Sequence, residues 1–577
     1  MLQRFLAGVL CITFGLVAAA QAQYVERNLP PSAPARAPAL RGVPELLTST
    51  DATPLGANLC AVVILGAKDK PAPRRGCAAG VDISRADPAF APLMRDQIAP
   101  LLGQPLSQKL IGDVQKAVAR VYRGAGRPFV SITAPPQEVT RGVLQIRVIE
   151  FRLGRVNIQG SPSAAEHVRA GFRLAPGAVI DARVLETDID WLNRNPLIRV
   201  EAVFAPGKEL GTTDVTLQVT ESRPIQGFAG YANSGTVLTD RDRFFAGAVA
   251  SLGFGAFASY QVSGSKNFWG DGGHWFNEAD AGYASHAGRL VVPLWVRSSL
   301  EVLADTVRTN ERPIAAPLLR TDTREMLVLS RTALSNASPV LIGDLLAGVE
   351  FKHQQRDLFL AGVDTFQASA DVFQYALGWA GQWADEYGVN NLDMRVKNNP
   401  GGVLGGNTAA NWATYTGGRV TDNRATFATV AYGRVTPLWV GTSLSTEFYG
   451  LVSGKALPDT ERIAPGGAQV VRGYVIDDGA FDRAYVLRNS LYAQSIAMPT
   501  TNTIFTGALA PFVFSDVGTA HDVFSGRDAT LASVGAGLDQ AFGGFYRANL
   551  TAAYALRDGP FTDAGTWRLH ARVVLTY

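Results

Sequence analysis

The side chains that most often carry chemistry are few in this sequence, and they stand in no recognisable arrangement. The sequence has no Cys-x-x-Cys pair, no phosphate-binding glycine loop and no G-x-S-x-G turn. The glycine-rich stretches at 270–276 and 400–407 stand among turn residues, which favours loops. The six histidines lack the spacing of metal ligands. They are His167, His274, His286, His353, His521 and His570. We therefore predict no enzyme, no metal site and no cofactor.

Two cysteines could form a covalent link. Cys60 and Cys77 remain once a signal peptide is removed, and 16 residues separate them. In an oxidising compartment this pair favours a disulfide, with two free buried thiols as the alternative. Closing a loop of that size stabilises a fold by about 3 kcal/mol.

Residues 1–22 have the composition of a secretory signal peptide. Arg4 precedes an apolar run, and Ala20 and Ala22 mark a cleavage site. We expect the mature chain to start at Gln23. No later stretch has the roughly 18 consecutive apolar residues of a membrane-spanning helix. An exported membrane protein with this sequence would therefore have to be a β-barrel.

Charge gives little guidance to partners. The 577 residues include 53 lysines and arginines and 50 aspartates and glutamates, a formal net charge of +3. No block of like charge provides a basic tail, so we predict no nucleic-acid partner. The 59 glycines indicate many turns and close backbone contacts.

The N-terminal third reads as a linker followed by two small αβ modules. Residues 23–57 are rich in proline and alanine, which predicts an extended linker. The first module covers 58–150 and the second 151–222, and both follow a β-α-α-β-β order. In the first we expect strands at 59–67, 127–136 and 142–150 and a helix at 107–126. In the second we expect strands at 152–160, 197–207 and 213–221 and a helix at 181–195.

From Arg223 to Tyr577 the helical stripes give way to weakly alternating segments of about ten residues, the pattern of transmembrane β-strands. At about 22 residues per strand and loop, 223–577 would form about sixteen antiparallel strands. A soluble β-sandwich or propeller is the alternative. The even spread of tyrosine and tryptophan and the lack of a blade-length repeat favour a membrane barrel.

The last strand shows the expected register. Trp567, Tyr577 and the apolar residues of the same parity would face lipid, with the two aromatic residues near opposite interfaces. Arg568, His570 and Arg572 would point into a wet lumen. A charged side chain in mid-bilayer costs about 2–4 kcal/mol, which fixes this register. We expect the last strand to pair with the first and close the barrel.

Three stretches carry a resemblance to a known family. These are "LNRNPLIRVEAVFAPGKELGTTDVTLQVTES", "APGGAQVVRGY" and "FVFSDVGTAH", and "YANSGT" at 231–236 fits a first barrel strand. The chain resembles the Omp85 superfamily, and specifically its two-partner-secretion branch, the TpsB transporters of ShlB/FhaC/HecB type. The resemblance implies two periplasmic POTRA domains before the outer-membrane barrel, the second of ShlB type at 151–222.

The resemblance also implies a site inside the barrel. Val471, Arg472, Gly473 and Tyr474 match the tip of a loop that folds back into the lumen, and Phe514, Asp516 and Gly518 match a motif on the wall. In the family the loop arginine contacts the strand aspartate, so Arg472 is expected to contact Asp516. A buried guanidinium needs an acidic partner, and the wall motif has one parity, so its members face inward together. An ordinary strand-end ion pair is the alternative.

The implied function is export of one large TpsA-type exoprotein, captured unfolded by the POTRA domains and passed through the barrel. The other expected partners are outer-membrane lipids, lipopolysaccharide and the machinery that inserts the barrel. One alternative is an Omp85-type insertase, which usually has more POTRA domains. A porin-like channel is the other, but it leaves the two lumen motifs unexplained.

Overall fold

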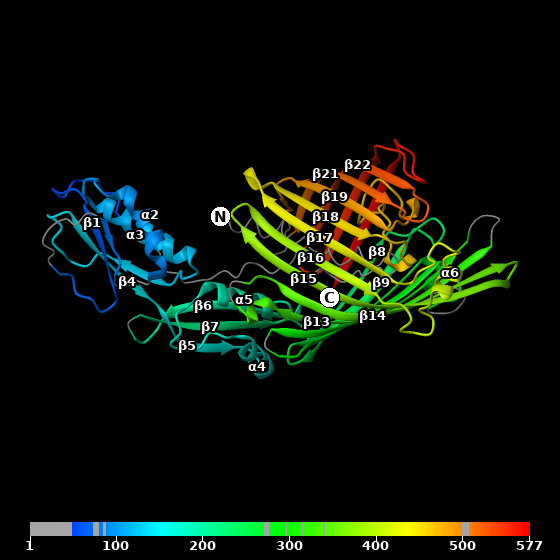
Figure 1. Cartoon of the computed structure of the whole chain (residues 1–577), viewed down its shortest axis with the longest axis horizontal. Coiled ribbons are helices and arrows are strands. Elements are labelled where there is room, and N and C mark those ends of the chain that lie inside the picture. Colours follow the sequence, from blue (N-terminus) through cyan, green and yellow to red (C-terminus); the bar gives the residue numbers. More distant parts are fainter. Residues whose placement is uncertain are drawn as a thin grey trace. The chain divides into compact units, whose positions relative to one another are not determined.

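The computed structural model describes residues 49–72, 80–84, 88–209, 211–269, 276–295, 297–312, 317–338, 341–498 and 507–577 (Figure 1). The described residues form two compact units, one ending at Ser222 and the other running from Arg223 to Tyr577. The predicted signal peptide, the linker up to residue 48, Cys77 and His274 lie outside the described residues.

The first module is an α+β layer built on a four-stranded sheet in the order β2-β1-β4-β3. Helix α3 begins at the N-cap Ser107, whose hydroxyl accepts a hydrogen bond from the Leu110 amide, and ends at Gly124. Its apolar stripe packs on the sheet around Val62, Ile64 and Leu144. The elements are β1 (Ala61–Leu65), β2 (Gly80–Asp82), α2 (Ala91–Ile98), α3 (Gln108–Gly124), β3 (Val130–Thr133) and β4 (Val143–Glu150).

The second module has the predicted β-α-α-β-β order and a three-stranded sheet, β5-β7-β6. Leu185, Ile189 and Leu192 of α5 are buried against the sheet. The elements are β5 (Arg152–Gln159), α4 (Pro162–Gly171), α5 (Ala182–Leu192), β6 (Ile198–Pro206) and β7 (Thr212–Glu221). The first module departs from the predicted order because β2 adds a short parallel strand beside β1.

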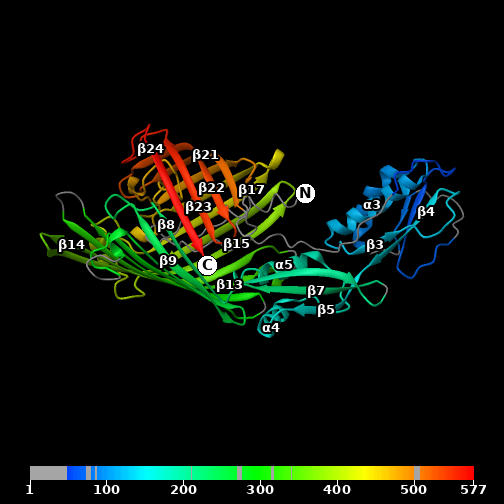
Figure 2. The ribbon, with the colours of Figure 1, turned by 180° about the vertical axis from the view of Figure 1, so that it is seen from behind.

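The second unit is a closed antiparallel barrel of sixteen strands, which confirms the predicted fold class. Strands β19 and β20 both pair with β21, so these two segments make one interrupted strand. Closure occurs where β24 pairs with β8 (Figure 2). The segments are β8 (Ile225–Ala232), β9 (Arg243–Gly253), β10 (Ala256–Gly264), β11 (Tyr283–Pro293), β12 (Ser298–Glu311), β13 (Leu318–Ala333), β14 (Asp344–Leu360), β15 (Val363–Asp385), β16 (Gly388–Asn399), β17 (Ala425–Pro437), β18 (Ser443–Ser453), β19 (Arg483–Tyr492), β20 (Ile496–Met498), β21 (Gly507–His521), β22 (Asp528–Phe542), β23 (Tyr546–Ala555) and β24 (Trp567–Thr576).

The outer wall of the barrel is apolar, and one of its rims carries aromatic side chains. Outward positions such as Leu377, Val513 and Leu569 are more than half exposed. Consecutive strands alternate in direction, so every second turn lies at the end where β8 starts. Five of these turns expose an aromatic residue: Phe254, Trp295, Tyr387, Trp439 and Phe545. An apolar band bordered by aromatic residues is the surface that a bilayer requires.

Two long loops leave the opposite rim. The first, residues 400–424, contains the short helix α6 (Ala409–Tyr415). The second, residues 454–482, joins β18 to β19 and carries the predicted loop-tip motif. We call them the α6 loop and the infolded loop. No helix among the described residues is long and apolar enough to cross a membrane.

Candidate gate in the barrel lumen

The tip of the infolded loop is a compact turn closed by its own backbone. The Gly467 amide donates to the Tyr474 carbonyl at 2.9 Å, and the Val471 amide donates to the Pro465 carbonyl at 3.0 Å. Gly467 has a φ of +112°, a conformation that residues with a side chain rarely adopt. These bonds hold Arg472 at the end of the turn.

Arg472 and Asp516 form a buried, two-pronged ion pair. Nε of Arg472 donates to Oδ2 of Asp516 at 2.7 Å, and Nη2 donates to Oδ1 at 2.6 Å. The Arg472 amide adds a bond to Oδ2 at 3.1 Å. The arginine side chain is 6% exposed and the aspartate 0%. Charge-assisted bonds in a site this dry are strong, and losing either partner strands a buried charge.

The inner wall supports the arginine on its remaining sides. Its Cζ lies 3.6 Å from the centre of the Phe514 ring, within the range of a cation–π contact. Nη2 also donates to the Ser490 hydroxyl at 3.1 Å. On β24, His570 Nε2 donates to the Arg472 carbonyl at 2.7 Å, and Arg568 Nε donates to the Gly473 carbonyl at 3.1 Å. The last strand thus points His570 and Arg568 inward, in the register that its alternating pattern predicts.

Two glycines let the loop and the wall approach. A Cβ on Gly518 would lie 2.9 Å from Cγ2 of Val471, and a Cβ on Gly473 would lie 2.7 Å from Cβ of Ser533. Neither distance leaves room for a methyl group. Glycine is therefore required by contact between loop and wall at both positions.

Tyr474 anchors the other side of the tip. Its hydroxyl lies 2.9 Å from the Ala532 carbonyl and 2.8 Å from the Arg557 carbonyl, and it accepts a bond from the Ala532 amide at 3.1 Å. Tyr474 and Val471 are fully buried and pack against Leu531 of β22. All four tip residues of the predicted motif thus contact the inner wall.

A second group of charges, which the sequence analysis did not identify, holds the stem of the infolded loop. Glu461 lies 2.6 Å from Lys352 of β14 and 3.3 Å from Lys397 of β16. Both lysines also contact Glu350 of β14, at 3.2 and 2.7 Å. Because the wall supplies its own acid, the lysines stay paired when Glu461 leaves. The stem contact therefore costs less to release than the Arg472–Asp516 pair.

The remaining predicted residues take no part in the contacts between the loop tip and the inner wall. Trp567 is 66% exposed at the start of β24, and Tyr577 is 84% exposed, with Cζ of Arg223 4.5 Å from its ring centre. The two aromatic residues therefore stand at opposite ends of the strand. Cys60 is disulfide-bonded. Its pairing with Cys77 remains a prediction, since Cys77 falls in the undescribed stretch 73–79.

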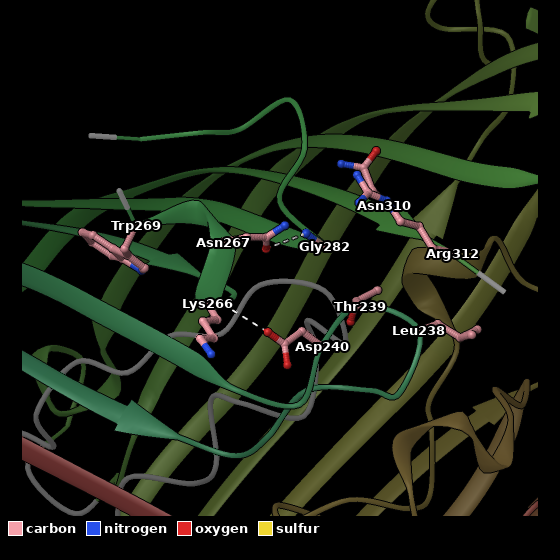
Figure 3. A pocket seen from close by; sticks show the side chains of 9 residues that line it. All are labelled: Leu238, Thr239, Asp240, Lys266, Asn267, Trp269, Gly282, Asn310 and Arg312. Carbon is pink, nitrogen blue, oxygen red and sulfur yellow. Dashed lines mark hydrogen bonds between the residues drawn. The ribbon is translucent and has the colours of Figure 1, made fainter. Parts of the chain in front are cut away.

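A pocket opens at the rim that carries the long loops (Figure 3). Its volume is about 510 Å³. Lys266, Asp240 and Asn267 line it, and the Lys266 amide donates to Asp240 Oδ2 at 3.2 Å. Among the described residues, no cluster of histidine, cysteine, aspartate and glutamate could hold a metal ion.

In this chain two small αβ modules are followed by a barrel that holds a charged loop tip inside it. Residues 345–540 match the family model of the haemolysin secretion/activation protein ShlB/FhaC/HecB. Residues 88–150 match the ShlB-type POTRA domain. Over these two stretches the chain is similar to the ShlB/FhaC/HecB family of TpsB transporters, and it has the Omp85-like fold. The POTRA match lies in the first module, so a ShlB type for the second module remains a prediction.

Curated relatives match over part of their length. The outer membrane transporter CdiB of Escherichia coli is 28% identical over 142 residues, which are 25% of this chain and 24% of the relative. The heme/hemopexin transporter protein HuxB of Haemophilus influenzae is 19% identical over 188 residues, 31% of each chain. This chain thus spans a quarter to a third of the relatives that it matches.

Solved structures share the fold over nearly the whole chain. CdiB from Escherichia coli aligns with a TM-score of 0.66 at 18% identity, covering 94% of both chains. CdiB from Acinetobacter baumannii aligns with a TM-score of 0.58 at 13% identity, again over 94% of both. The family is one of transporters and not of enzymes, and it places the barrel in the outer membrane with the POTRA region in the periplasm.

Proposed function

We propose that this chain is a two-partner-secretion pore that moves one large exoprotein from the periplasm to the cell surface. The observation that carries the proposal is the buried Arg472–Asp516 pair between an infolded loop and the barrel wall. A small-solute channel has no need of a loop locked across its lumen by a charge pair. A pore for an extended polypeptide must be closed at rest and must open widely.

In this proposal residues 58–150 and 151–222 are two periplasmic POTRA domains, and residues 223–577 are the barrel. The modules would capture unfolded cargo by strand addition at a sheet edge, where backbone bonds give affinity with little sequence demand. The longest edge strand is β6, with nine residues. Residues 1–22 would direct export, and lipopolysaccharide, other outer-membrane lipids and the barrel-insertion machinery would be the further partners.

The gate would work by release of the loop. When cargo reaches the lumen, the tip leaves Asp516 and the stem leaves Lys352 and Lys397. Lys352 and Lys397 of the wall remain paired with Glu350, whereas Asp516 loses Arg472, its cationic partner. This difference makes the tip the energetically decisive contact. Because the chain has no nucleotide site in its sequence, folding of the exported cargo would supply the drive.

The test is deletion of the gene and comparison of the secreted and outer-membrane proteomes. Loss of one large exoprotein, restored by the wild-type gene, supports the proposal. A broad loss of outer-membrane barrels would instead identify an insertase. A defect confined to small-solute uptake would identify a channel. The Arg472→Ala variant should still give a heat-modifiable barrel but export less cargo, because a pore that opens without cargo has lost the contact that couples loop release to cargo arrival.

A further inference from the structure

Arg419 of the α6 loop makes largely buried contacts with the infolded loop. Arg419 Nη1 donates to the Leu457 carbonyl at 2.7 Å, and Nη2 donates to Asp459 of the infolded loop. Arg419 also lies 3.7 Å from Asp482, which is fully buried. The Arg419 side chain is 13% exposed and that of Asp459 is 19% exposed, so the pair is screened much less than a surface ion pair.

The wall joins the same network. Arg356 of β14 donates through Nη2 to Asp459 Oδ2 at 3.0 Å and through Nη1 to the Tyr415 carbonyl of α6 at 3.1 Å. Its Cζ lies 4.7 Å from the centre of the Tyr415 ring. One wall arginine thus touches both loops, and the Asp459 carboxylate is held between Arg356 and Arg419.

Helix α6 is seated on the lumen side of the wall. Trp412 and Tyr415 are buried against Ala370 and Val372 of β15. Ala370 and Val372 lie on the same face of β15 as Gln374. Gln374 donates a hydrogen bond to Glu350 of the stem cluster, so this face is turned toward the lumen. The Trp412 indole donates to the Asp371 carbonyl at 3.0 Å. The α6 loop is therefore a packed element of the mouth and not a loose surface loop.

We propose that the α6 loop is a second closing element of the pore and that Arg419 is the positioning residue that couples it to the infolded loop. The Asp459 carboxylate is the shared anchor. While Arg419 holds it, the stem cannot leave the wall unless α6 is displaced as well. The pore then opens only when both loops move. This inference rests on the proposed function only in requiring a pore that can open.

The test is single-channel recording of the purified full-length chain in planar bilayers, which needs no cargo. Arg419→Gln should raise the open probability about tenfold, the factor equivalent to about 1.4 kcal/mol. Asp459→Asn should raise it at least as much, and the double variant should open no more often than Asp459→Asn alone. Arg331→Gln is the matched control, because Arg331 pairs with Asp344 on the wall, at 2.9 Å.

The outcomes separate this inference from the proposed function. If Asp459→Asn opens the pore while Arg419→Gln behaves like Arg331→Gln, the α6 loop is passive and the inference is overturned. Independent effects that multiply in the double variant would also overturn it. If Arg419→Gln fails to give a heat-modifiable barrel, Arg419→Lys replaces it, since a lysine keeps the charge but loses the planar fork that donates to Leu457 and Asp459, and the open probability should again rise. A changed exoproteome alone would bear on the cargo and not on this coupling.

Discussion

Replacing Arg472 by alanine should shift the pore strongly toward its open state. The substitution removes both prongs of the Asp516 pair and the bond to Ser490, and it leaves a fully buried carboxylate without its cation. Breaking a buried pair from one side costs about 3–5 kcal/mol. If that cost falls on the closed state, the ratio of open to closed pores rises by about two to three and a half powers of ten.

The assay is open probability in planar bilayers, with export of the exoprotein measured in cells. The Arg472→Ala/Asp516→Ala double variant should be less open than the single variant, because it removes the stranded charge as well. Arg331→Ala serves as the control, since Arg331 forms its ion pair within the wall. Each variant must retain heat-modifiable mobility, which shows that the barrel has folded.

One result would refute this reasoning. If Arg472→Ala keeps the open probability of the control, the pair does not hold the loop in place. If instead the double variant opens more than the single variant, the unpaired Asp516 carboxylate is not what destabilises the closed state of Arg472→Ala.

Three further predictions concern other parts of the chain. Gly518→Ala places a methyl group against the loop tip, 2.9 Å from its nearest atom, and overpacking of about 1–3 kcal/mol should raise pore opening. Gly544→Ala, which meets nothing within 4 Å, should leave it unchanged. Asp188→Asn should weaken the second module by about 3 kcal/mol, because Arg173 loses its buried partner, and faster hydrogen exchange in α5 would show it. Burial lowers the pKa of His167, so its contribution to the unfolding free energy is complete above about pH 6.5 and is lost as the pH falls toward the lower folded-state pKa. The protection factors of the α4 amides, which correct for the slower intrinsic exchange at lower pH, should therefore fall as the pH is lowered below about 6.5, and equal profiles in the wild-type chain and His167→Gln would contradict this.

The parts of the fold that could be predicted are those written in local patterns. The stripe of α3 and the period-two alternation of β23 each fall within one element, so the sequence shows them directly. Helices α2 and α4 have no comparably clear pattern. Helix α2 starts with Ala91 and Pro92, and α4 is short with few apolar residues, so neither has a long apolar stripe.

The gate was predictable only in its tip. Arg472 and Asp516 stand in short motifs that the family shares, and the resemblance named them as partners. The stem cluster has no such motif. Glu461 meets Lys397 across 64 residues of sequence and Arg419 meets Asp459 across 40, because two loops fold into the same mouth. Periodicity within a strand says which side a lysine faces but not which loop will reach it.

Cargo should pass through the barrel only after the loop tip has left the wall. The close approach of Val471 to Gly518 allows a direct test, in which Val471→Cys and Gly518→Cys are combined and the cross-link is formed in living cells. Gly518→Cys alone should disturb the loop contact as Gly518→Ala does, so the quantity to measure is the change in export on oxidation. We predict that export of the exoprotein by the double variant stops when the pair is oxidised and returns when it is reduced, whereas oxidation leaves the export of each single cysteine variant unchanged. Undiminished export through a fully cross-linked barrel would show that the tip need not leave the wall.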